Sequence, residues 1–75
     1  MTKTLKTEFM IGTHVEFTGD RAEEAVSEFD EAMRAAERAA FAFRADGEEE
    51  IAAKMKLPER IAKQFDVSVK VVQDF

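Results

Sequence analysis

Apolar residues recur at alternating steps of four and three positions along residues 20–46, DRAEEAVSEFDEAMRAAERAAFAFRAD. This spacing places them on one face of a helix, so the stretch is predicted to form a single long amphipathic helix. At 1.5 Å per residue the helix would be roughly 40 Å long. Other parts of the chain must cover its apolar face, which consists of Ala22, Val26, Phe29, Met33, Ala36, Ala40 and Phe43.

A period of two replaces this spacing in the first 19 residues, where β-branched and aromatic residues alternate with other types. That pattern is typical of a strand with one buried face, so residues 1–19 are predicted to supply one strand. Gly12 weakens its interior and indicates a bulge or a close backbone approach. The side chains expected to lie against the long helix are Phe9, Ile11, Val15 and Phe17.

A lone strand leaves its amide groups unpaired, so this one needs a partner. Residues 65–73 and the same strand of a second copy are two candidates. Residues 40–45 fit less well, because Phe43 keeps the helical spacing.

Residues 47–65 are predicted to be helical. Ile51 and Met55 lie four positions apart, and Ile61 and Phe65 repeat that step further along. Pro58 between these pairs interrupts the helix or opens a new one.

The last residues support two interpretations. Val67, Val69 and Val71 alternate with polar residues, which favours a strand beside the first one. Alternatively, Ala62 stands where two helices would approach closely, Asp66 occupies a turn, and Ser68 could cap a helix.

On those three residues the stretch from Pro58 to Phe75, PERIAKQFDVSVKVVQDF, resembles a helix-turn-helix DNA-binding motif. The resemblance implies that residues 66–75 form a recognition helix in the major groove. The side chains that would then contact DNA are Ser68, Val69, Lys70 and Gln73.

The charge balance argues against nucleic acid as the partner. Sixteen acidic and 11 basic residues give a net charge of −5, and such a protein repels phosphate backbones. There is no cysteine, which fits a reducing cytoplasm, and no apolar stretch is long enough to span a membrane.

Catalytic and metal-binding patterns are missing as well. His14 is the only histidine, and neither Ser27 nor Ser68 stands in a nucleophile-like context. Neighbouring carboxylates on the long helix point about 100° apart, so they do not converge on one substrate. We therefore expect no enzymatic activity, no metal and no cofactor.

Phe41 departs from the apolar face of the long helix. It falls on the charged face together with Arg34, Glu37 and Arg38. Either the second half of the chain folds over and covers it, or the ring is an exposed anchor for a protein partner.

Together these patterns predict an α+β fold in which residues 1–75 form one domain and a small antiparallel sheet packs on the long helix. The function we expect is that of a small acidic regulator or inhibitor, which binds a macromolecular partner and forms a homodimer. The alternatives are a helix-turn-helix transcriptional regulator and a structural subunit of a larger assembly.

Overall fold

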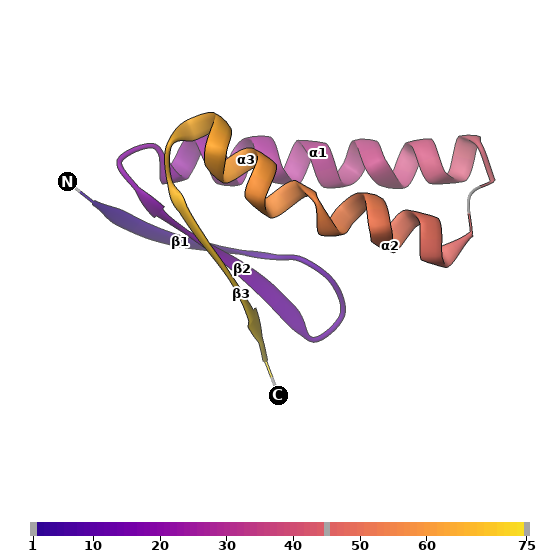
Figure 1. Cartoon of the computed structure of the whole chain (residues 1–75), viewed down its shortest axis with the longest axis horizontal. Coiled ribbons are helices and arrows are strands. Elements are labelled where there is room, and N and C mark those ends of the chain that lie inside the picture. Colours follow the sequence, from indigo (N-terminus) through magenta and orange to yellow (C-terminus); the bar gives the residue numbers. More distant parts are fainter. Residues whose placement is uncertain (1, 45, 75) are drawn as a thin grey trace.

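An antiparallel sheet packs against one layer of helices in the computed structural model, which describes residues 2–44 and 46–74 (Figure 1). This arrangement confirms the predicted α+β class. None of the described helices is long and apolar enough to cross a membrane. In chain order the elements are β1 (Lys3–Glu8), β2 (Thr13–Gly19), α1 (Ala22–Ala42), α2 (Gly47–Met55), α3 (Leu57–Phe65) and β3 (Ser68–Gln73).

The first 19 residues form a hairpin of two strands, so the prediction of one strand was wrong. Gly12 takes a left-handed φ of 75° between β1 and β2. The Thr13 hydroxyl closes the turn, because it accepts a hydrogen bond from the Met10 N–H at 2.9 Å and lies 2.8 Å from the Met10 carbonyl to which it donates. Phe9 is buried as predicted, whereas Ile11 sits in the turn with an exposed fraction of 101%.

The C-terminal stretch forms strand β3, and it completes the sheet in the order β1-β2-β3. Its alternating valines favour the strand over the helix, because Val67 and Val69 pack against the core while Val71 pairs with Val15 of β2. Asp66 has the left-handed conformation suited to a helix-turn-helix turn, but it leads from α3 into a strand. The predicted recognition helix therefore does not form over residues 68–73; Phe75 lies outside the described residues.

Helix α1 is shorter than the predicted 20–46. It ends at Ala42 because Arg44 turns the chain with a φ of 53°. The Asp46 carboxylate then caps α2 by accepting the Glu49 N–H at 2.8 Å. The following helical region is divided at Lys56 into α2 and α3, and Pro58 lies in the first turn of α3 as predicted.

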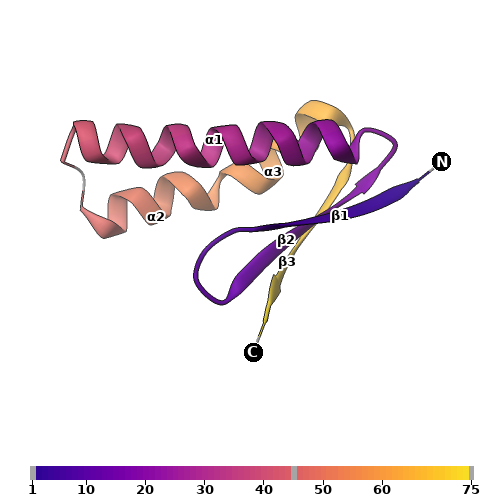
Figure 2. The ribbon, with the colours of Figure 1, turned by 180° about the vertical axis from the view of Figure 1, so that it is seen from behind.

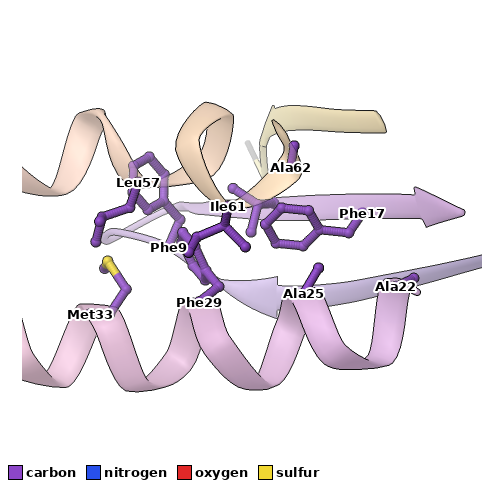
Figure 3. Packing of buried hydrophobic residues seen from close by; sticks show 10 residues of the cluster. Phe9, Phe17, Ala22, Ala25, Phe29, Met33, Leu57, Ile61 and Ala62 are labelled. Carbon is purple, nitrogen blue, oxygen red and sulfur yellow. The ribbon is translucent and has the colours of Figure 1, made fainter. Parts of the chain in front are cut away.

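The hydrophobic core lies between the sheet and the first half of α1 (Figure 3). Phe29 of α1 is its centre: its ring is 5.5 Å from that of Phe17 and 5.8 Å from that of Phe9, measured between centroids. Ile61 of α3 is also fully buried and closes the core from the other side. The buried hydrophobic residues are Phe9, Val15, Phe17, Ala22, Ala25, Phe29, Met33, Leu57, Ile61 and Ala62.

The second half of helix α1 and the neighbouring α2 project past the sheet, as both views of the ribbon show (Figures 1 and 2). No residue of α2 is buried. On α1 the predicted apolar face continues, but Ala36 and Ala40 are only half-buried and Phe43 is exposed. The molecule thus has a well-packed body and a thin helical extension.

Candidate protein-binding surface

The end of the helical extension carries two exposed aromatic rings. Phe41 lies in the last turn of α1 with an exposed fraction of 87%, and Phe43 follows the helix with 84%. The interpretation that the second half of the chain covers Phe41 was therefore wrong. Two large apolar side chains in solvent make this end a candidate binding surface.

Arginines accompany Phe41 on α1. Arg34 and Arg38 share its face, because they precede it by seven and three positions. Arg34 is well exposed and approaches Glu31 only at 4.0 Å. Glu37, the fourth residue predicted at this site, instead accepts a hydrogen bond from Lys54 of α2 at 3.1 Å. The predicted group is thus divided between an exposed arginine face and a bridge to α2.

Acidic residues follow on the other helix of the extension. Asp46, Glu48 and Glu49 are exposed at the start of α2, where negative charge suits the helix dipole. The sequence shows this acidic run, but our predictions did not connect it with Phe41. We use the name tip for Arg34, Arg38, Phe41, Phe43, Arg44, Asp46, Glu48 and Glu49.

A charged bridge holds α2 to α1 behind the tip. The Lys54 ammonium is 3.1 Å from Glu37 and 3.3 Å from Glu50, and its side chain is only 13% exposed. Partial burial lowers the pKa of Lys54, but the hydrogen bonds to Glu37 and Glu50 outweigh that effect and the pKa is raised. Lys54 therefore stays charged and cross-links the two helices.

An open cleft of about 560 Å³ separates the hairpin turn from the extension. Phe9, Ile11 and Ile51 contribute apolar surface to it. Its charged residues are four carboxylates and one cation, Lys54, which pairs with two of them, so the net negative charge of the cleft suits a positively charged group. The four acidic residues are Glu8, Glu37, Glu50 and Asp74.

The outer face of the sheet carries a histidine between two carboxylates. His14 Nδ1 lies 2.5 Å from Asp74 Oδ1, and its Nε2 lies 2.9 Å from Glu16 Oε2. The hydrogen bond to Glu16, followed by that to Asp74, raises the pKa of His14, and the same bond lowers the pKa of Glu16. This cluster ties the end of β3 to β2; among the described residues no group of three or more His, Asp or Glu could hold a metal ion.

The residues predicted to contact DNA do not share one face. Ser68 and Lys70 alternate with Val69 along β3, so neighbouring side chains point to opposite sides of the sheet. Lys70 is directly opposite Glu16 of β2.

Comparison with protein-family models, curated proteins and solved structures gives no match. The function of the chain is therefore inferred from its own residues. Within the described chain, the tip and the adjacent cleft combine exposed apolar area with segregated charge.

Proposed function

We propose that this protein is a non-enzymatic interaction protein that regulates or inhibits a macromolecular partner by docking through the tip. The observation that carries the proposal is the exposure of Phe41 and Phe43, at 87% and 84%, on a helical end that projects from the body. Exposed aromatic residues surrounded by polar ones are typical of protein interfaces.

The energetics favour a binding role for these rings. A phenylalanine offers about 150–250 Å² of area to a partner, and aromatic anchors often dominate the affinity of an interface. Neither ring contributes to the core of the free chain, in which Phe29 and Phe17 are fully buried. Burial by a partner would therefore recover apolar area that folding leaves in water.

Helix α2 supports the same proposal. It buries no residue, so it adds little to the hydrophobic stability of the body. The Lys54 bridge nevertheless holds it beside α1, and the Asp46 N-cap stabilises its first turn. An element that is kept in place without contributing to the core fits a role in presenting a surface.

The experiment that tests the proposal is site-specific photo-crosslinking in cells. Phe41 is replaced by photoreactive benzoyl-phenylalanine, which keeps an aromatic ring at the site. The control places the same group at Thr4, which is exposed on β1 far along the chain from the tip. We expect a discrete crosslinked protein from position 41 and none from position 4.

A second variant separates docking from random collision. Phe43→Ser in the crosslinking chain should reduce the product by about tenfold or more, because it removes a neighbouring anchor. Equal yields from positions 41 and 4, or a product indifferent to Phe43→Ser, would show that the tip is not a docking surface.

A further inference from the structure

We propose that the occupant of the tip is a second copy of this chain, related to the first by a two-fold axis that passes between the two tips. This inference rests on the proposed function, because it takes the tip to be a binding surface. It adds the identity and symmetry of what binds there.

The charges of the tip have the pattern that a two-fold axis needs. Arg34, Arg38 and Arg44 lie on or just after α1, whereas the acidic residues lie at the start of α2. In a two-fold interface each patch meets its own copy, so a patch of one sign would repel itself. Here the arginines of one copy can face the carboxylates of the other, and the reverse contact follows by symmetry.

The net charge of the tip also favours a second copy over a strongly charged partner. Three arginines and three carboxylates give the tip a net charge of zero, although the whole chain carries −5. A uniformly basic or acidic partner would be attracted to one set of these charges and repelled about equally by the other. A basic partner finds its better match in the acidic cleft beside Ile51.

Phe41 supplies the apolar anchor of the interface. With an exposed fraction of 87%, its ring presents roughly 130–220 Å² per chain, whereas Phe43, two positions further on, points away from the arginine face. A stable interface buries about 800 Å² per partner. Phe41 would thus supply roughly a fifth of that area as an aromatic centre, and the charged residues around it would supply much of the rest.

Sedimentation equilibrium of the full chain tests the inference directly. Across about 1 µM to 1 mM, a range that spans weak to moderate dissociation constants, the mass should rise from 8.5 kDa toward twice that value. Phe41→Ser with Phe43→Ser should weaken association by about 30-fold or more. Ile11→Ser, which removes an equally exposed apolar residue from the hairpin turn, is the matched control and should leave the dimer unchanged.

A charge swap tests the two-fold pairing itself. One chain carries Arg38→Glu and Arg44→Glu, and the other carries Glu48→Lys and Glu49→Lys. Each double reversal changes the charge of the tip by four, from zero to −4 or to +4. We expect each variant alone to dimerise about tenfold more weakly and an equimolar mixture to form a heterodimer at least as tight as the original dimer.

Circular dichroism of each variant verifies that α2 still forms, since lysines near its N-terminus oppose the helix dipole. A wild-type mass that stays at 8.5 kDa up to about 1 mM overturns the inference. A dimer that is indifferent to both the serine variants and the charge swap overturns it too, because the two copies then meet elsewhere. A monomeric chain that still crosslinks another protein through position 41 would refute the second copy while leaving the proposed function standing.

Discussion

The two halves of helix α1 carry the same apolar spacing but have different surroundings. In the supported half, residues 22–33, Ala25 and Phe29 are fully buried beneath the sheet and α3. In the projecting half, residues 34–42, the spacing continues while Ala36 and Ala40 are only half-buried. Periodicity therefore identifies the face of a helix that can be buried, whereas the rest of the fold decides how much of that face is covered.

The largest expected effect contrasts one phenylalanine from each half. Phe29→Ala should lower the free energy of unfolding by about 3–5 kcal/mol, because it leaves a cavity against Phe9 and Phe17. Phe41→Ala should change it by less than about 0.5 kcal/mol, since the ring is 87% exposed. Urea unfolding of the monomer at low protein concentration measures both values. Similar losses for the two variants would mean that the halves do not differ as described.

A glycine at the end of β2, just before the supported half, gives the next largest effect. Gly19 has a φ of 155°, and a Cβ there would lie 2.8 Å from Cγ1 of Val67. Gly19→Ala should therefore cost about 1–3 kcal/mol through backbone strain and overpacking. Thermal unfolding measures the loss, and Gly47→Ala is the control because a Cβ at that position meets nothing within 4 Å. Equal behaviour of the two variants would contradict the close packing of the turn on Val67.

The N-cap of α2 gives a smaller effect, confined to the helical extension. Asp46→Ala removes the acceptor for the Glu49 N–H and should destabilise α2 by about 1 kcal/mol. Because α2 buries no residue, faster amide exchange should be confined to residues 47–55, with the global unfolding free energy nearly unchanged. Asp46→Asn, which keeps an acceptor, should restore most of the protection. Faster exchange in α3 as well would show that the two helices open as one unit.

The smallest effect comes from pH and should act on the sheet, where His14 lies, and not on α2. Glu16, and then Asp74, raise the pKa of His14 above 6.5. The protonated imidazole therefore stabilises the fold fully below pH 6.5. The contribution is lost as the pH rises through the folded-state pKa, because the proton that the folded chain holds more tightly is then released. Hydrogen bonding to His14 lowers the pKa of Glu16 below 4.5, so the pair also weakens when acid protonates Glu16.

Urea unfolding of wild type and His14→Gln across about pH 4 to 9 measures this dependence. The stability difference between the two should be greatest between the ordinary values of 4.5 and 6.5 and should shrink on the alkaline side. The amides of α2 should exchange with the same relative protection throughout. A difference that is constant with pH would mean that the His14 cluster is not formed in solution.

Much of this fold follows from the sequence. The buried face of α1 and the pairing of the C-terminal strand with β2 follow from the spacing of apolar residues, and Val67, Val69 and Val71 favour strand over helix. The hairpin was missed because alternation runs unbroken from Phe9 to Phe17, although Gly12 stood in the middle as a turn signal.

The candidate surface could be predicted only in part. Phe41 was singled out by its position off the apolar face, and the structure places it in solvent. The exposure of Phe43 could not be predicted, since it fits the helical spacing and its exposure depends on where the sheet ends. The split of Glu37 from Arg34 and Arg38 depends on Lys54, which is distant in sequence.

The position of β2 at the middle of the sheet has a consequence for biosynthesis. Its first neighbour, β1, precedes it directly, but β3 leaves the ribosome more than 50 residues later. At about 5–20 residues per second that delay amounts to several seconds, during which β2 lacks the strand that pairs with its second edge. The nascent chain therefore exposes the apolar faces of the β1–β2 hairpin and of α1, which chaperones can bind. It can acquire its final packing only when translation has passed Gln73.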